Sequence, residues 1–258
     1  MTHNSVAIQP ATHEHTYELH TTYFNYDPSN GAVIGRNEVV GQFVRRPARG
    51  GQCADAVEWL GCRAGNAASR QEPIADWREM PFAKGFAYTF DFEAELGKFP
   101  IDVSSIPRDF DGWFFYVHIL DAHNQFDILR TRRYGKADEL SKPGDSVVRD
   151  HSEQFELEDW SPLFRSQFDR SSKINVTTWT GVGEYAGHAA NVLYYRCDDV
   201  PMQVEAPATE MRMTGITSYH GHIYLDHETG TLLGGDLFEY VILTSGYQHR
   251  EVYLKLLR

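Results

Sequence analysis

The sequence predicts a mostly β protein, an antiparallel β-barrel or barrel-like sandwich with one or two short helices. Short apolar stretches recur along the chain and are separated by turns that contain Gly, Pro, Asn and Asp, as is typical of all-β domains. Aromatic residues, which favour strands, are abundant: 15 Phe, 14 Tyr and 5 Trp. Several stretches also alternate between apolar and polar residues with a period of two, which indicates half-buried strands.

The first part of the chain divides into a tail and a hairpin. We expect residues 1–16 to form a flexible N-terminal tail, because they are polar and lack periodicity, and residues 17–258 to form a single barrel-like domain. Residues 17–25 and 32–44 form the first predicted hairpin. Its turn at 26–31 contains Pro28 and Gly31, which supply the backbone angles that a tight turn needs.

The middle of the chain is less regular. Within residues 47–84 the segment Ala54–Cys62 fits either a short helix or a strand. Residues 86–92 place aromatic side chains at every second position, which predicts a strand with one aromatic face. The run Trp113–Leu120 is apolar on both faces, so we expect a central strand that forms a second hairpin with residues 126–131. Residues 135–173 are expected to form a loop with one helix near Glu153–Phe164. This segment is either a lid over the mouth of the barrel or a plain surface connection.

The last third of the sequence predicts a series of short strands that are separated by turns. In the final strand Val252, Leu254 and Leu256 alternate with polar residues, so one face is buried. The predicted strands cover 174–181, 189–197, 202–206, 210–226, 232–243 and 249–258, with turns at Tyr185–His188, Asp198–Pro201, His227–Gly230 and Thr244–Tyr247.

A short motif occurs near both ends of the chain. Asp27, Gly31 and Gly35 have the same spacing as Asp226, Gly230 and Gly234. Turn glycines permit positive φ, and the second glycine of each set favours a bend or bulge. One interpretation is a barrel of two similar halves whose first and last strands meet; the other is chance similarity between two hairpins.

Composition and the N-terminal residues restrict the kinds of partner and the cellular compartment that we expect. The formal net charge of −12 repels phosphate backbones and anionic lipid, so we expect no nucleic-acid partner and no membrane partner. The first 16 residues lack the basic start and apolar run of a signal peptide, which predicts a cytoplasmic protein. The three cysteines, Cys53, Cys62 and Cys197, are then expected to be reduced thiols.

The most suggestive candidate site lies in the segment 218–226. Alternation along a strand places Ser218, His220, His222 and Tyr224 on one face. If this face lines the interior, the imidazoles and the phenol act as acid, base and hydrogen-bond donors. Alternatively, His220 and His222 bind a divalent metal with a third ligand from elsewhere, or the face simply meets solvent.

A second candidate stripe lies in the run 113–120. As a strand, this run places Phe114, Tyr116 and His118 on one face, and the paired strand brings Arg130 near them. A histidine in so apolar a segment is expected to be buried, which lowers its pKa toward the neutral, base-competent form. The alternative is a core histidine that is bonded to a backbone carbonyl and has no chemical role. We expect the two stripes to converge inside one barrel.

Further residues are predicted to bind the substrate or to orient a histidine. Asp236 and Glu239 lie on the strand next to that of the His220 stripe, and either of them can orient a histidine across the hairpin. The predicted catalytic residues are therefore His220, His222, Tyr224, His118 and Tyr116. The predicted substrate-binding residues are Arg130, Phe114, Phe90, Tyr88, Asp236 and Glu239.

The absent motifs shape the functional prediction. The sequence has no Rossmann glycine motif, phosphate-binding loop or nucleophile elbow, which disfavours those enzyme classes. We expect a cofactor-independent lyase, isomerase or cyclase that uses acid–base chemistry on a small hydrophobic molecule, aromatic, polyketide-like or terpenoid-like, in a barrel pocket. The alternatives are a lipocalin-like binding protein without catalysis and a metal-dependent barrel enzyme. A homodimer through edge strands is a further hypothesis.

Overall fold

The chain forms an antiparallel sheet with one long helix. The computed structural model describes residues 6, 11–48, 54–91, 101–127, 140–151, 154–156, 165–169, 173–206, 210–244 and 246–258. The helices are the 3₁₀ turn η1 (Pro81–Ala83) and α1 (Phe110–Asp127). The strands are β1 (His15–Tyr26), β2 (Val33–Pro47), β3 (Ala54–Ala67), β4 (Arg78–Glu79), β5 (Ala87–Asp91), β6 (Ser146–His151), β7 (Gln154–Glu156), β8 (Arg165–Asp169), β9 (Lys173–Tyr185), β10 (His188–Ala206), β11 (Met211–Asp226), β12 (Leu232–Leu243) and β13 (Gly246–Leu256).

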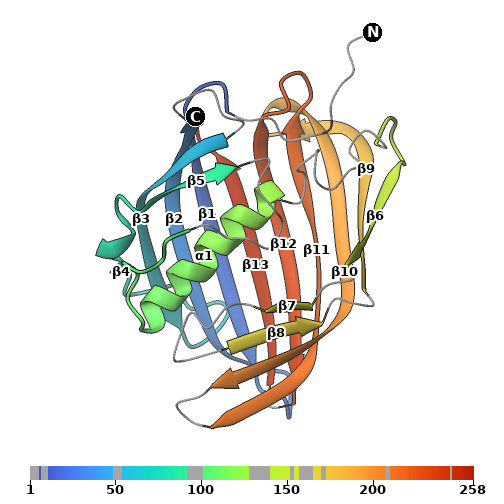
Figure 1. The fold of residues 1–258 in the computed structure, drawn as a ribbon. Helices are drawn as coiled ribbons and strands as arrows, with labels where there is room; N and C mark the ends of the chain where they lie inside the picture. The colour runs from blue at the N-terminus through green and yellow to red at the C-terminus, as the bar shows by residue number, and fades with distance from the viewer. Residues whose placement is uncertain are drawn as a thin grey trace.

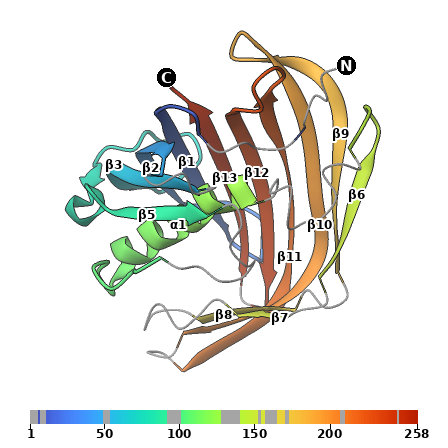
Figure 2. The same ribbon diagram turned by 45° about the horizontal axis from the view of Figure 1, so that its top comes forward.

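The described strands form a single sheet in which every ladder is antiparallel (Figure 1). Its main path runs β4-β3-β2-β1-β13-β12-β11-β10-β8-β7. Off this path, β5 pairs with β3, β9 pairs with β10, and β6 pairs with β9. Strands β1 and β13 pair, so the first and last strands meet as expected. The sheet curls strongly (Figure 2) but its two sides share no ladder among the described strands. The predicted fold class is therefore confirmed in its open, barrel-like form.

Helix α1 lies across the concave face of the sheet, against β1, β2 and β13 (Figure 1). The core forms between them around Trp59, whose ring lies 5.0 Å from that of Phe43 and 5.2 Å from that of Phe115 on α1. Trp59, Phe43 and Phe115 are fully buried. The burial of such large aromatic side chains is the main force that holds the helix on the sheet.

The prediction of a central strand at Trp113–Leu120 is wrong, because this run lies within α1. A run that is apolar on both faces fits a buried helix as well as a buried strand. The local signal for the helix precedes the run: the carboxylate of Asp109 accepts a hydrogen bond from the backbone N–H of Gly112 at 2.9 Å. Asp109 is thus the N-cap, which favours a helix from Phe110 onward.

The two copies of the Asp-x3-Gly-x3-Gly motif adopt the same local structure. Gly31 and Gly230 both have φ of 70°, and their backbone N–H groups donate to Asp27 and Asp226 at 2.8 and 2.9 Å. Each hairpin also has a bulge next to the second glycine of the motif, Gly35 or Gly234. The likeness of the two hairpins is therefore structural, while duplication of two whole halves stays a hypothesis.

Other expectations differ in detail. Ala54–Cys62, ambiguous in sequence, lies in β3. The turn expected at Asp198–Pro201 is instead a bulge within β10, where Asp199 has φ of 53°. Strand β1 begins at His15, inside the expected tail, and the N–H of Ala11 donates to Asp55 at 2.9 Å. Of the helix expected near 153–164, residues 154–156 form β7 and the others lie outside the described residues.

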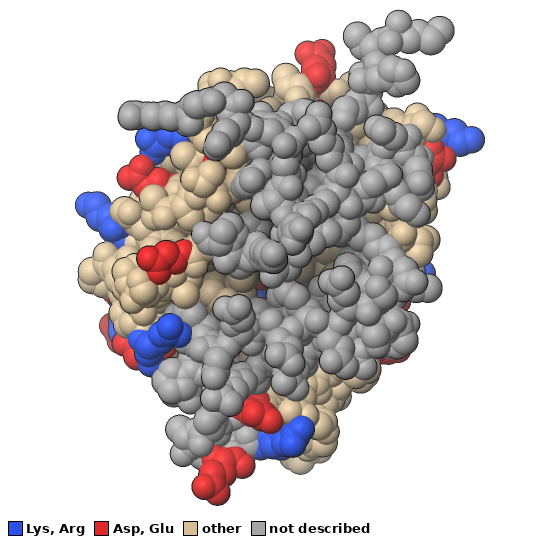
Figure 3. Space-filling view, in the orientation of Figure 1, with Lys and Arg blue, Asp and Glu red and all other residues tan. Residues whose placement is uncertain are grey.

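The described surface carries both signs of charge. In the view of Figure 3, acidic and basic side chains of described residues lie interspersed around the periphery of the face that carries α1 in Figure 1. None of the helices in the described part of the chain combines the length and the apolar character that crossing a bilayer requires.

Candidate functional site

The His220 stripe lies on the convex face of the sheet. Along β11, Ile223 and Leu225 are fully buried in the core that includes α1, whereas His220, His222 and Tyr224 are half-buried on the opposite face. Since side chains alternate along a strand, the three polar residues point away from the concave side. They therefore do not converge with His118, which lies on α1 within the core.

The convex face nevertheless contains an ordered polar set. Asp236 on β12 accepts a hydrogen bond from the backbone N–H of His222 at 2.8 Å and lies 3.1 Å from its Nδ1. The Tyr224 hydroxyl donates to the other oxygen of Asp236 at 3.3 Å. Burial and the nearby Asp236 charge raise the pKa of Tyr224 to about 12. Asp236, one of the two carboxylates expected to face a histidine across this hairpin, therefore contacts His222, and its role in orienting that histidine stays a prediction.

Aromatic rings continue this face across neighbouring strands. The rings of Tyr240 and His249 are stacked with centroids 4.5 Å apart, and those of Tyr194 and His222 lie 5.3 Å apart. Such cross-strand pairs stabilise a sheet. Among the described residues no group of three or more His, Cys, Asp or Glu side chains is arranged to hold a metal ion.

The concave face contains a cluster of ionic side chains beneath α1, which we call the acid–arginine cluster: Asp121, Glu239 and Arg250. Arg250 on β13 donates through Nη1 to Asp121 on α1 at 2.8 Å, and its Nη2 lies 2.8 Å from Glu239 on β12. Thr217 on β11 donates to the second oxygen of Glu239 at 2.8 Å. One guanidinium thus holds two carboxylates that come from different elements.

Burial sets the protonation of this cluster. The side chain of Asp121 is 4% exposed, whereas those of Arg250 and Glu239 keep 14% and 15% exposure, so Asp121 is the most deeply buried member of the cluster. Burial, opposed by the Arg250 charge and reinforced by the Glu239 charge, raises the pKa of Asp121 to about 6. Burial alone would lower the pKa of Arg250, but the two carboxylates raise it well above its usual value, so Arg250 stays charged.

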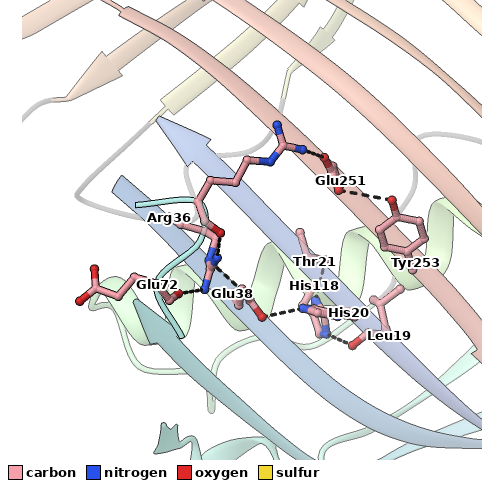
Figure 4. Close-up of polar contacts among 10 residues, drawn as sticks. Leu19, His20, Thr21, Arg36, Glu38, Glu72, His118, Glu251 and Tyr253 are labelled. Atoms are coloured by element: carbon pink, nitrogen blue, oxygen red, sulfur yellow. Dashed lines mark hydrogen bonds and ion pairs between the residues drawn. The ribbon is translucent and has the colours of Figure 1, made fainter. Parts of the chain in front are cut away.

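His118 and Thr21 lie beside the cluster in the core, and Figure 4 shows these two residues with Leu19. The Thr21 hydroxyl on β1 lies 3.1 Å from His118 Nδ1 and 3.4 Å from Asp121. Nε2 of His118 lies 3.1 Å from the carbonyl oxygen of Leu19. His118 is fully buried, and this burial lowers its pKa to about 3. The predicted burial and neutral state of His118 are both met, although on a helix rather than a strand.

Two tyrosines lie beside the cluster, Tyr23 opposite Arg250 in the β1–β13 ladder and Tyr219 opposite Glu239 in the β11–β12 ladder. Tyr23 on β1 is buried with its ring 5.4 Å from that of Phe114, and burial raises its pKa well above the usual value. The Tyr23 hydroxyl and Arg250 Nε are buried without a hydrogen bond of ordinary geometry to the described residues. Tyr219, opposite Glu239 in the β11–β12 ladder, packs partly exposed against the core.

The other predicted residues have different environments. Phe90 is buried in β5, while Tyr88 and Tyr116 are partly buried against the core. All three therefore contribute aromatic side chains to the packing of the core. Arg130 lies outside the described residues.

Sequence reasoning missed Asp121, Arg250 and Thr21. Arg250 had a usable signal: it shares the apolar face of the last strand with Val252 and Leu254, and a lone charge on a buried face requires a partner. Asp121 follows His118 by three residues, which places both on one helix face only once the segment is known to be helical. Thr21 had no such signal.

The comparisons with known proteins find only distant similarity. No protein family matches this sequence, and no curated protein does. Among solved structures, DynF from the dynemicin biosynthesis pathway of Micromonospora chersina is 7% identical, with a TM-score of 0.26 over 96% of this chain and 80% of that chain. A protein with a YmcC-like fold from Bacteroides fragilis is 8% identical, with a TM-score of 0.25 over 98% of each chain. Likeness this low carries no argument about the function of this chain.

Proposed function

We propose that the protein binds a small, largely hydrophobic molecule on the concave side of its sheet and catalyses proton transfer on it without a cofactor. The reaction classes are isomerisation, cyclisation, elimination and decarboxylation, and the substrate is aromatic, polyketide-like or terpenoid-like. Asp121 donates or accepts the proton, and Arg250 and Glu239 hold Asp121 in place. The roles assigned from sequence to His220, His222 and Tyr224 are not part of this proposal.

The observation that carries the proposal is the acid–arginine cluster in an aromatic environment. A general acid or base works best when its pKa is near the working pH, and burial raises the pKa of Asp121 to about 6. The permanently charged Arg250, 2.8 Å away, stabilises negative charge that develops beside Asp121. Tyr23, which packs against Phe114, is buried beside Arg250 and makes the environment of the cluster apolar.

A binding function without catalysis is the second candidate. It is favoured by a specific feature of the cluster: each carboxylate already has Arg250 and a threonine hydroxyl near it, as in a purely structural ion-pair network. Structural networks of this kind also shift pKa values. In this alternative the aromatic environment retains a hydrophobic ligand unchanged.

The test begins with native mass spectrometry of the purified protein, which identifies any organic molecule that co-purifies. That molecule, together with a panel of aromatic and polyketide-like carbonyl compounds, is then incubated with the protein in D₂O. Proton-transfer catalysis predicts deuterium incorporation or conversion, detected by mass. The Asp121→Asn variant should retain binding and lose about 10²- to 10⁴-fold in rate, the usual contribution of a general acid or base.

The control is Asp102→Asn, which changes an exposed carboxylate that accepts hydrogen bonds from Ser104, outside the cluster. This variant should convert substrate at the wild-type rate. Full activity of Asp121→Asn would refute the catalytic role of Asp121. A bound molecule recovered unchanged and without deuterium, from the wild-type protein, would favour the binding function instead.

A further inference from the structure

Two carboxylates share the guanidinium of Arg250. Its Nη1 donates to Oδ1 of Asp121 at 2.8 Å, and its Nη2 lies 2.8 Å from Oε2 of Glu239. Two carboxylates on one cation repel each other, so a proton taken up by the pair is bound mainly by one of them. Which carboxylate binds it depends on the burial of each side chain and on the donors at its remaining oxygen.

The remaining oxygens have different surroundings. Oε1 of Glu239 accepts a hydrogen bond from the hydroxyl of Thr217 at 2.8 Å, and Thr217 is 2% exposed. Oδ2 of Asp121 lies 3.4 Å from its partner among the described residues, the Thr21 hydroxyl. Because O–H···O hydrogen bonds span about 2.5–3.0 Å, that contact is weak. Within the described residues, Glu239 therefore has a close donor at each oxygen, whereas Asp121 has one at Oδ1 only.

Burial differs in the same sense. The side chain of Asp121 is 4% exposed and that of Glu239 is 15% exposed. Burial disfavours the charged form of a carboxyl group, and hydrogen-bond donors favour it. Burial and the Glu239 charge raise the pKa of Asp121 to about 6, against the lowering effect of Arg250. Donors thus favour the negative charge on Glu239, and burial favours the proton on Asp121.

We propose that Thr217 is a positioning residue: its hydroxyl holds Glu239 as the ionised member of the pair, and the proton is thereby left on Asp121. This inference rests on the proposed function, in which Asp121 is the group that transfers the proton. It adds that Glu239 acts through its negative charge and does not exchange a proton itself, and that Thr217 on β11 determines this division of roles.

Other charged or titratable residues lie around the pair on four elements. Within the described residues they are Arg250 of β13, Tyr23 of β1, Tyr219 of β11 and His118 of α1. Arg250 stays charged and contacts both carboxylates, so it does not distinguish between them. Burial keeps Tyr23 and His118 neutral, because it raises the pKa of the phenol and lowers that of the imidazole to about 3. Thr217 differs from these groups, since it donates to Glu239.

The experiment follows the carboxyl ¹³C resonances of Asp121 and Glu239 by NMR while the ligand-free protein is titrated with acid. In the wild-type protein the carboxyl carbon of Asp121, and not that of Glu239, should show the protonation shift near pH 6. Thr217→Val keeps the shape of the side chain and removes the donor to Glu239. Glu239 then loses part of its negative charge to protonation, so the pKa of Asp121 should fall by about half a unit, part of the one unit or more that a hydrogen bond to a charged group is worth. Thr217→Ser, which keeps the hydroxyl, should restore the wild-type value.

Two further variants separate the effect of charge from that of packing. Glu239→Gln removes the negative charge altogether and should lower the pKa of Asp121 by about one unit or more. Thr177→Val is the matched control, because Thr177 on β9 is 4% exposed and its hydroxyl has no hydrogen-bond partner in the described part of the chain. It should leave the titration of Asp121 unchanged.

An unchanged or raised pKa of Asp121 in Thr217→Val would overturn the inference, and so would a protonation shift near pH 6 at Glu239 in the wild-type protein. The wild-type titration needs no variant, so the inference can be refuted even if Thr217→Val does not fold. Because these readouts need no substrate, their failure leaves the proposed function standing. Loss of the proposed function would instead appear as an active Asp121→Asn variant.

Discussion

At Gly41 the backbone of β2 passes beneath His118 and beside Trp59. A Cβ atom at this position would lie 2.6 Å from the Trp59 ring and 3.1 Å from the His118 ring. Both rings are fully buried and cannot move aside easily. The absence of a side chain at one residue therefore allows α1 to bring His118 down to Leu19 and Thr21.

Gly41→Ala should destabilise the fold by about 1–3 kcal/mol, the usual cost of overpacking a buried site. Urea unfolding followed by tryptophan fluorescence measures the effect. Gly61→Ala on β3 is the matched control, because no atom lies within 4 Å of its added Cβ. Equal stabilities of the two variants would show that the packing at Gly41 has room to relax.

At the scale of elements, α1 is the piece on which the site depends. It brings Asp121 and His118 onto the concave face, and its position is fixed at the start by Asp109 and in the core by Phe115 against Trp59. The strands supply the other half: Arg250 and Glu239 face each other across the β12–β13 ladder. A shift of the helix by one turn would separate Asp121 from Arg250.

Asp109→Ala should lower the stability by about 1 kcal/mol, since it removes the N-cap bond to Gly112. Asp109→Asn should have little effect, because asparagine caps helices about as well as aspartate. Chemical unfolding of both variants gives the comparison. If alanine is tolerated as well as asparagine, packing rather than capping determines where α1 begins.

At the scale of the whole molecule, burial of neutral histidines makes stability depend on pH. Burial lowers the pKa of His118 from 6.5 to about 3 and that of His15 to about 4. These groups contribute stability that is fully present above pH 6.5 and is lost as the pH falls through their folded-state values. Asp121 acts in the opposite sense, because its pKa is raised: its contribution is present below pH 3.8 and is lost as the pH rises through about 6.

The free energy of unfolding should therefore fall as the pH is lowered from 6.5 toward 3, with a His118 share on the order of 4 kcal/mol. His118→Gln should flatten this dependence, because glutamine does not titrate. His188→Gln, which changes an exposed histidine 3.9 Å from Asp226, should change the profile much less than His118→Gln does. A His118→Gln profile as steep as that of the wild-type protein would place the pH dependence elsewhere.

Some features of the fold are determined locally and were predictable. The hairpin turns at Asp27–Gly31 and Asp226–Gly230 follow from glycine at positive φ and from aspartate side chains that bind the turn backbone. Strands β5 and β13 were predictable because apolar and polar residues alternate along them with a period of two. These signals depend only on neighbours in sequence, so no tertiary information is needed to read them.

The sequence by itself therefore determined the β class and the hairpin turns at Asp27–Gly31 and Asp226–Gly230, and it left Asp236 and Glu239 as alternative partners of a histidine across a hairpin. Only the tertiary structure decided which face of β11 meets the core, because alternation defines two faces but not the one that another element covers. It also decided that Trp113–Leu120 is a helix, since a doubly apolar run fits either form. The acid–arginine cluster arises because Asp121 on α1 meets Glu239 and Arg250 on β12 and β13, residues far from it in the chain that it reaches only when the sheet curls around α1.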